Sequence, residues 1–320
     1  MLAVRIHETG GPEVMGVEEV PEPAPGPGQV LVRLAATGVN FVDIYYRMGL
    51  YPSDLPTTPG SEACGEVVAI GDGVDGVAVG QRVCSVEFAG AYAEYAIVAA
   101  ERAVPVPDGV GDDVAAAALL QGMTAHYLLR DSYPAKAGDT VLVHAAAGGM
   151  GLLLCQMASR MGIRVIGTAS TPEKAELARG AGAAEVLDYD DVAAKVRALT
   201  RGAGVDAVYD GVGRSMAEVN LASLRRHGVW VQFGNASGAV PPIDPLRLMS
   251  AGSLYVTRPT LGHFITTRES LLRRAGDVLG SIADGELSIR VGGRYPLSEA
   301  PRAHEDLQAR RTTGKLLLVP

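Results

Sequence analysis

Residues 140–151 read TVLVHAAAGGMG, an apolar run that breaks into small residues and then turns apolar again. The run has the composition of a buried strand, and the next segment, GLLLCQMASRMG, has a helical pattern. Between them stands Ala146-x-Gly148-x-x-Gly151, a variant of the dinucleotide-binding turn with alanine in place of its first glycine. We therefore expect a dinucleotide phosphate to bind the backbone N–H groups that open this helix. The residues expected to form this site are Ala147, Gly148, Gly149, Met150 and Gly151.

Strand and helix patterns alternate on both sides of this motif, from about residue 112 onward. Further strand patterns lie at 163–168, 185–188, 205–210, 229–233 and 253–257, and helical patterns fill most gaps between them. Such alternation predicts an α/β domain with a doubly wound parallel sheet, the Rossmann arrangement. The first hundred residues differ, because short strand patterns at 2–6, 30–36, 65–71 and 82–86 stand between Gly and Pro clusters. This part of the chain is predicted to be β-rich and barrel-like.

Composition narrows the class of protein. The 320 residues carry a formal net charge of −8, which argues against a surface for nucleic acid or an anionic membrane. No run approaches the roughly 18 apolar residues of a membrane span, and the N-terminus does not resemble a signal peptide. The three cysteines are far apart, so we expect packing thiols in a reducing, cytoplasmic setting.

The segment after the second strand of the α/β part indicates which dinucleotide binds. It reads IGTASTPEK, without the Asp or Glu that accepts hydrogen bonds from the ribose 2′-OH of NAD. Ser170 can donate to a 2′-phosphate, and Lys174 can pair with its charge. NADPH is therefore favoured over NADH. Tyr189, after the third strand, is a further candidate to cover this phosphate, although a surface tyrosine is a nearly equal alternative.

Ligands of open α/β sheets lie outside the carboxyl ends of the strands. Residues that follow the fourth and fifth strands are therefore expected at the ribose and the nicotinamide. They are Gly211, Phe233, Gly234, Asn235 and Ser237. His144, at the end of the first strand of the α/β part, is expected to have a structural role.

The chain resembles the zinc-independent quinone oxidoreductases of the medium-chain dehydrogenase/reductase superfamily. The resemblance runs over essentially the whole length. The motifs that carry it are GGPEV, GVNFVDIYYRMGLYP, HAAAGGMG, YDGVGR, FGNASGAV and SLYVTRP.

This resemblance implies a GroES-like catalytic domain formed by residues 1–120 and 263–320, with a Rossmann NADPH-binding domain at 121–262 between them. It places the cofactor in the cleft between the domains. It also implies a homodimer in which the last Rossmann strand, Ser253 to Thr257, pairs with its copy. An apolar edge strand left exposed would be prone to uncontrolled pairing, which agrees with this implication.

A catalytic metal is not expected. Zinc alcohol dehydrogenases of this superfamily carry Cys-x-x-Asp and Gly-His-Glu at the metal. The matching segments here are Asn40-Phe41-Val42-Asp43 and Gly60-Ser61-Glu62, which lack the Cys and the His. One carboxylate does not form a tetrahedral zinc site. Without a Lewis acid, hydride delivery to an electrophilic acceptor is the chemistry that remains.

The resemblance also assigns further site residues. It places Asn40, Tyr45 and Tyr51 at the acceptor pocket, where phenol or amide groups can hydrogen-bond a carbonyl oxygen that gains charge. Packing at a domain junction is the alternative for each of these residues. Asp43 is expected beside the cofactor, where it orients the backbone or Arg47. The remaining cofactor candidates are Thr124, Tyr127, Arg258 and Lys315.

The sequence thus predicts an NADPH-dependent quinone reductase that works without a metal. The close rival is an NADPH-dependent enone or alkenal double-bond reductase, which uses the same hydride geometry on a carbon atom. A non-catalytic NADPH-binding protein is the rival from another class. The physiological acceptor and the number of electrons transferred at once are not determined by the sequence.

Overall fold

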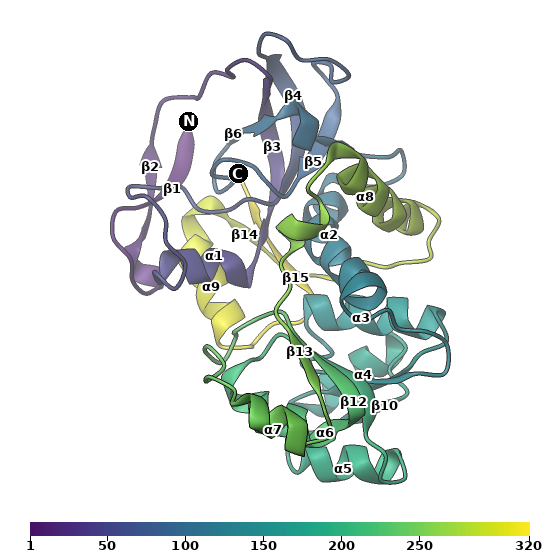
Figure 1. Ribbon diagram of the computed structural model, residues 1–320. Helices are drawn as coiled ribbons and strands as arrows, with labels where there is room; N and C mark the ends of the chain where they lie inside the picture. The colour runs from purple at the N-terminus through teal and green to yellow at the C-terminus, as the bar shows by residue number, and fades with distance from the viewer. The chain divides into compact units, whose positions relative to one another are not determined.

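The chain passes twice between two structural units (Figure 1). The computed structural model describes all residues, 1–320. Unit 1 comprises Met1–Met123 and Ile265–Pro320, and unit 2 comprises Thr124–Phe264. The expected domain boundaries, 120/121 and 262/263, lie within three residues of these crossings.

Unit 1 is built on a seven-stranded, mostly antiparallel sheet. Its order is β14-β15-β3-β4-β5-β7, and β6 pairs with β3. The strands are β3 (Gln29–Val39), β4 (Ala63–Ile70), β5 (Arg82–Ser85), β6 (Tyr95–Ala99), β7 (Val104–Pro105), β14 (Val291–Pro296) and β15 (Lys315–Val319). A separate hairpin joins β1 (Leu2–Ile6) and β2 (Met15–Glu19). This is the GroES-like domain expected from the resemblance.

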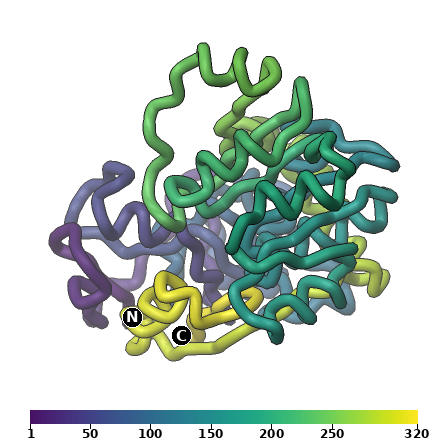
Figure 2. The backbone as a smooth tube through the Cα atoms, turned by 90° about the horizontal axis from the view of Figure 1, so that it is seen from below, coloured from purple at the N-terminus to yellow at the C-terminus, as the bar shows by residue number.

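The C-terminal segment belongs to unit 1 because it completes this sheet. β15 pairs antiparallel with β3, so a strand near residue 317 lies beside one near residue 38. Arg268, which opens helix α8 (Arg268–Ala283), donates to the carbonyl oxygens of Ala100 and Glu101. Figure 2 shows the yellow C-terminal segment beside the purple N-terminal one. Helices α1 (Phe41–Arg47) and α9 (Ala300–Gln308) also belong to unit 1, and α2 (Asp112–Tyr127) begins in it.

Unit 2 is a six-stranded sheet in the order β10-β9-β8-β11-β12-β13, and every pairing in it is parallel. The strands are β8 (Thr140–Val143), β9 (Arg164–Thr168), β10 (Glu185–Leu187), β11 (Val205–Asp210), β12 (Leu224–Gln232) and β13 (Tyr255–Thr257). The helices are α3 (Gly149–Arg160), α4 (Pro172–Gly180), α5 (Val192–Leu199), α6 (Ala217–Ser223) and α7 (Pro245–Ser250). The doubly wound Rossmann sheet is confirmed.

Several element ends differ from the expected ones for backbone reasons. The pattern TVLVHA predicts a strand over 140–145, but β8 stops at Val143, because Ala145 adopts a left-handed conformation with φ of 51°. The last Rossmann strand is shorter than predicted, since Ser253 is also left-handed and pairing begins at Tyr255. Helix α2 (Asp112–Tyr127) continues into a π-helical turn, Leu128–Ser132.

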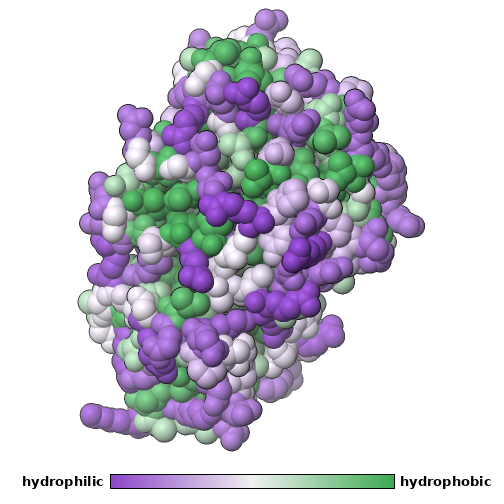
Figure 3. Space-filling model, turned by 180° about the vertical axis from the view of Figure 1, so that it is seen from behind, coloured by the Kyte–Doolittle hydropathy of each residue, from purple (hydrophilic) through white to green (hydrophobic).

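The interior of each unit is apolar and continuous. In unit 2, Trp230 and Val208 belong to a cluster that also contains helix residues such as Leu221. All three cysteines are buried free thiols, and burial raises their pKa values, as expected of packing residues. Apolar side chains reach the face drawn in Figure 3 in patches separated by polar ones. None of the helices has the length and apolar character needed to cross a membrane.

Gly65 offers a test of the contact between β3 and β4. The register shifts beside it, and a Cβ at Gly65 would collide with the Arg33 carbonyl oxygen and lie 2.9 Å from Leu34 Cα. We expect Gly65→Ala to lower the free energy of unfolding by about 2 kcal/mol, measured by urea denaturation, since backbone atoms must move. Gly16→Ala is the control, because nothing lies within 4 Å of a Cβ there. Equal stability of the two variants would contradict this description.

Candidate active site

The turn between β8 and α3 has the geometry of a phosphate site. Ala145 and Ala146 are held by β9, through hydrogen bonds from their N–H groups to Thr168 Oγ1 (3.1 Å) and Thr168 O (2.9 Å). Gly151 allows the helix to approach, because a Cβ there would lie 2.6 Å from Ala146 Cα. The first N–H groups of α3 have no partner within the helix, and no side chain caps them. These donors suit a pyrophosphate.

The alanine that replaces the first glycine is accommodated by a glycine elsewhere. Ala146 is fully buried, and a Cβ on Gly167 of β9 would lie 2.8 Å from the Ala146 Cβ. The missing side chain at Gly167 therefore leaves room for the methyl group in the turn.

Two neighbouring strands end beside the candidate 2′-phosphate residues. Thr168 and Leu187 are paired in register, so Ser170 and Tyr189 each stand two residues beyond the ends of adjacent strands. Thr171 caps helix α4 by accepting a hydrogen bond from Lys174 N, which places Lys174 in the first turn of α4. The end of β9 carries hydroxyl groups and no acid.

The loops after β11 and β12 are joined to each other. Phe233 N donates to Asp210 O (2.8 Å), and Ser237 donates from both N and Oγ to Val212 O (2.7 Å each). Gly211 lies against the Phe233 ring, where a Cβ would approach within 2.8 Å. The Gln232 amide holds Gly234 O and Asn235 Oδ1. The predicted residues of both loops therefore share one edge of the sheet, and Arg258 follows β13 at that edge.

His144 belongs to the support of this edge. Its Nε2 lies 2.7 Å from Asn220 Oδ1, and Asn220 Nδ2 donates to Asp210 Oδ2 at 2.8 Å. Because Asn220 Oδ1 accepts, the proton of the neutral ring is on Nε2. Burial lowers the pKa of His144. The ring joins the ends of β8 and β11, which is the structural role expected of it.

Two cofactor candidates lie on α2 instead of a strand end. Thr124 and Tyr127 are both buried. The Tyr127 ring stacks on Phe264 with centroids 4.1 Å apart and planes 5° from parallel. This packing fixes the Tyr127 ring close to where the chain leaves unit 2.

Charge is divided unequally between the units. Unit 2 contains 14 Lys or Arg and 12 Asp or Glu residues, whereas unit 1 contains 14 and 24. Unit 2 is therefore net positive in a protein that is negative overall, which suits a site for a polyanionic dinucleotide.

In unit 1, helix α1 carries the acceptor-side candidates. Asn40 is its N-cap and Asp43 its third residue, and Asn40 N donates to Asp43 Oδ2 at 2.8 Å. The Tyr45 and Tyr51 rings meet edge to face, with centroids 5.4 Å apart. Tyr46 is more exposed than Tyr45 and contacts Tyr51 from another direction. The Tyr45 and Tyr51 rings are thus brought together.

A buried ion pair holds Asn40. Lys315 Nζ lies 2.5 Å from both Glu62 Oε2 and Asn40 Oδ1, and the Lys315 and Glu62 side chains are at most 1% exposed. Asn40 Nδ2 donates to Glu62 Oε2 (2.9 Å) and Gly38 O (3.2 Å). Both N–H groups of the Asn40 amide are therefore used inside unit 1. Direct donation to an acceptor would require one of these bonds to break.

Part of this arrangement is not visible in the sequence. Asn40 and Lys315 are separate candidates there, and Glu62 appears only in the argument against zinc. Asp43 was expected to orient the backbone or Arg47; it orients the Asn40 backbone, while Arg47 reaches His304 Nδ1 instead (3.0 Å). His304 is 257 residues from Arg47 and Lys315 is 253 from Glu62, so no local pattern signals either contact.

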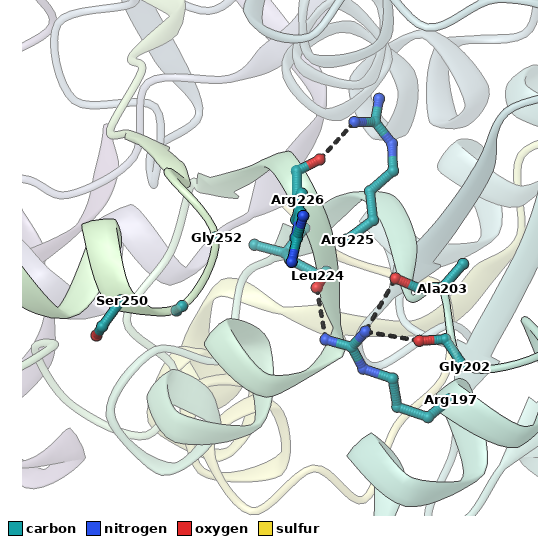
Figure 4. A pocket seen from close by; sticks show the side chains of 9 residues that line it. Arg197, Gly202, Ala203, Leu224, Arg225, Arg226, Ser250 and Gly252 are labelled. Atoms are coloured by element: carbon teal, nitrogen blue, oxygen red, sulfur yellow. Dashed lines mark hydrogen bonds between the residues drawn. The ribbon is translucent and has the colours of Figure 1, made fainter.

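Two pockets of unit 2 lie at the amino ends of its strands, opposite the edge described above, and both include arginine residues. One of about 520 Å³ is lined by residues that precede β11 and β13 and by the first residues of β12 (Figure 4). There Arg197 of α5 points its guanidinium at the carbonyl oxygens of Gly202, Ala203 and Leu224. The arginine thus serves to satisfy loop carbonyls at the amino ends of the strands, away from the predicted cofactor residues.

Comparison with known proteins shows the family to which the chain belongs. Residues 26–108 match the model of the alcohol dehydrogenase GroES-like domain, and residues 149–276 match the model named zinc-binding dehydrogenase. The chain is 47% identical to a quinone oxidoreductase of Pseudomonas aeruginosa over 97% of both chains. The chain is a quinone oxidoreductase of the medium-chain dehydrogenase/reductase superfamily.

Two further relatives are similar to the chain over its whole length. A crystal structure of the Escherichia coli quinone oxidoreductase with NADPH superposes with a TM-score of 0.98, at 41% identity and full coverage of both chains. A 2-haloacrylate reductase from a Burkholderia species is 41% identical over all of this chain and 99% of its own length.

The ion pair in unit 1 generates a stability prediction. Lys315→Met leaves the Glu62 carboxylate buried without its cation, so we expect a loss of about 3 kcal/mol in the free energy of unfolding. The double variant Lys315→Met/Glu62→Gln removes the unpaired charge and should recover much of that loss. Urea denaturation measures both. A single variant as stable as the unchanged protein would contradict the pair's role.

Proposed function

We propose that this quinone oxidoreductase oxidises NADPH and reduces a quinone without a metal. The observation that carries the proposal is the edge of unit 2 where β8, β9, β11 and β12 end, with uncapped helix N–H groups and no acid after β9. NADPH supplies a hydride from its nicotinamide when bound. The protein's own contribution is to hold the two reactants in reach and in orientation.

We assign the cofactor contacts by position on this edge. The amides of Ala147 to Gly151 bind the pyrophosphate, and Ser170, Lys174 and Tyr189 bind the 2′-phosphate. The residues proposed for the ribose and the nicotinamide are Thr124, Tyr127, Gly211, Phe233, Gly234, Asn235, Ser237 and Arg258. From unit 1 we propose Asn40, Asp43 and Lys315, whose side chains are tied to one another.

On the acceptor side we propose Tyr45 and Tyr51 as the residues that contact the quinone. Their rings offer apolar faces for a planar ligand, and a phenol O–H stabilises the oxygen on which charge develops. Asn40, proposed with them, acts through its fixed position at the start of α1.

An activated double bond is the alternative acceptor. The 2-haloacrylate reductase relative supports this reading, because an acrylate carries a carbon–carbon double bond. NADPH oxidation measured with ortho-quinones, para-quinones and α,β-unsaturated ketones or acids separates the two. Turnover of the unsaturated compounds alone would replace the quinone proposal. Tight NADPH binding without turnover of any acceptor would favour a non-catalytic role.

Lys174 tests the cofactor preference. Lys174→Ala removes the cation proposed for the 2′-phosphate, so we expect KM for NADPH to rise at least about ten-fold while KM for NADH stays within about two-fold. Steady-state kinetics with each cofactor measures this. Lys136→Ala is a matched control on the same unit. Equal changes for NADPH and NADH would remove Lys174 from the phosphate site.

We also propose a homodimer that forms through β13. This strand is the edge of its sheet, and Tyr255 on it is 62% exposed. Leu246 and Met249 of α7 are likewise exposed, on the green segment that projects in Figure 2. A second copy would pair the strand edge and cover these side chains.

The proposed location of the protein is the cytoplasm. Its three cysteines are buried free thiols, which supports a reducing compartment.

Sedimentation tests the dimer. Tyr255→Asp should shift the protein toward a monomer, because it places a charge in the proposed interface. Val79→Asp, a similar change at an exposed residue of unit 1, should leave the oligomeric state unaltered. A wild-type monomer at micromolar concentration would contradict the proposal.

A further inference from the structure

Four buried side chains in unit 1 form a row of hydrogen bonds that joins the two ends of α1. Arg47 Nη1 lies 3.0 Å from His304 Nδ1, and His304 Nε2 lies 2.9 Å from the Tyr92 hydroxyl. The hydroxyl lies 3.0 Å from Asp43 Oδ2. None of the four residues is more than 3% exposed. We call this row the Arg47–Asp43 relay.

The direction of every bond in the relay is determined by chemistry. A guanidinium only donates, so His304 Nδ1 accepts from Arg47 and the ring proton is on Nε2. Nε2 then donates to the Tyr92 oxygen, which leaves the Tyr92 proton for Asp43. Burial and the neighbouring Arg47 lower the pKa of His304 to about 3, so the ring stays neutral. Each hydrogen bond of the relay therefore donates in the same direction, from the Arg47 cation at one end to the Asp43 carboxylate at the other.

The relay replaces a contact that the helix could have made by itself. Asp43 and Arg47 are four residues apart on one helical face, a spacing at which such residues commonly pair directly. Here α9 and the loop before β6 insert His304 and Tyr92 between them. The insertion has its own support, because Gly60 leaves room for the Tyr92 ring, whose Cε1 would lie 2.7 Å from a Cβ at that position.

Helix α1 needs such external support. It has only seven residues, and isolated helices of this length are unstable in water. Asp43 also accepts from Asn40 N, so the relay continues to the N-cap and through its side chain to the Lys315–Glu62 pair. Tyr45 lies between Asp43 and Arg47, the two anchored residues.

We propose that Tyr92 and His304 are positioning residues for the reaction, which hold α1 at both ends and thereby fix Tyr45 and Asn40 against the acceptor. This inference rests on the proposed function of α1. Neither residue is expected to touch the substrate or the cofactor.

The carboxylate at the end of the relay supplies a measurable signature. The groups that face Asp43 are Tyr92, Lys315, Glu62 and the Asn40 N–H. Burial raises the pKa of Asp43 to about 7, and the hydrogen bond from Tyr92 acts in the opposite direction. Loss of that bond should therefore raise the pKa of Asp43 further. A drop in activity as Asp43 is protonated should then begin at higher pH.

Tyr92→Phe tests the proposal, because it deletes one hydroxyl and preserves the ring. We expect kcat for quinone reduction to fall about ten-fold, as small displacements of reacting groups commonly cause. KM for NADPH should stay within about two-fold, and the acidic limb of the pH profile should move upward. Tyr295→Phe is the matched control: it deletes a hydroxyl that donates to Asp306 at 2.8 Å in the same unit, and it should change neither kcat nor the profile.

Position 304 provides a second test in case Tyr92→Phe folds poorly. His304→Gln keeps a side-chain donor for Tyr92, whereas His304→Leu keeps none, so kcat should be higher for the Gln variant. Nitrogen-15 NMR of labelled histidine tests the hydrogen bonds of the relay without measuring turnover. The His304 ring should remain the neutral Nε2–H tautomer at pH 5. Its Nε2 chemical shift should change in Tyr92→Phe.

The proposal is overturned if Tyr92→Phe keeps the kcat and pH profile of Tyr295→Phe, or if the Gln and Leu variants at 304 are equally active. It is also overturned if His304 protonates near its ordinary pKa. Lack of quinone turnover by the wild-type protein would instead contradict the proposed function, while the NMR measurement would still test the relay.

Discussion

The buried pair of Lys315 and Glu62 is the interaction on which the position of the start of helix α1 depends. It places a cation from the C-terminal strand beside a carboxylate that directly precedes β4, and both groups are out of water. Removing two charges from water is costly unless each finds several partners. Asn40 and the Leu120 N–H provide them, the latter at 2.7 Å from Glu62 Oε1. The start of α1 is thereby tied to the sheet of unit 1.

This pair also gives a physical account of how the chain differs from its zinc-dependent superfamily members. The resemblance aligns Asn40 and Ser61 with the cysteine and histidine ligands of those proteins. Here an ammonium group contacts Asn40 and Glu62. The Lys315 ammonium supplies a positive charge beside these two side chains, and an ammonium offers no coordination position for an alcohol. Such an arrangement suits an acceptor that is already electrophilic.

The α/β part of the chain could be predicted well from the sequence, because its signals are local. The strand, the small-residue turn and the helix at 140–160 are contiguous, and the lack of an acid after β9 is visible in a few letters. The ends of the strands were predicted less accurately. β8 and β13 are shorter than expected, because Ala145 and Ser253 take left-handed conformations. Residue type alone does not predict that an alanine or a serine takes a left-handed conformation.

The sequence by itself therefore determined the α/β part of the chain with its dinucleotide-binding turn and the preference for NADPH, since each follows from neighbours along the chain. The tertiary structure decided what surrounds α1. Tyr92 and His304 are 212 residues apart, and Arg47 and His304 are 257 apart. Hydrogen bonds over such separations depend on the sheet that pairs β15 with β3, and no local sequence pattern predicts them.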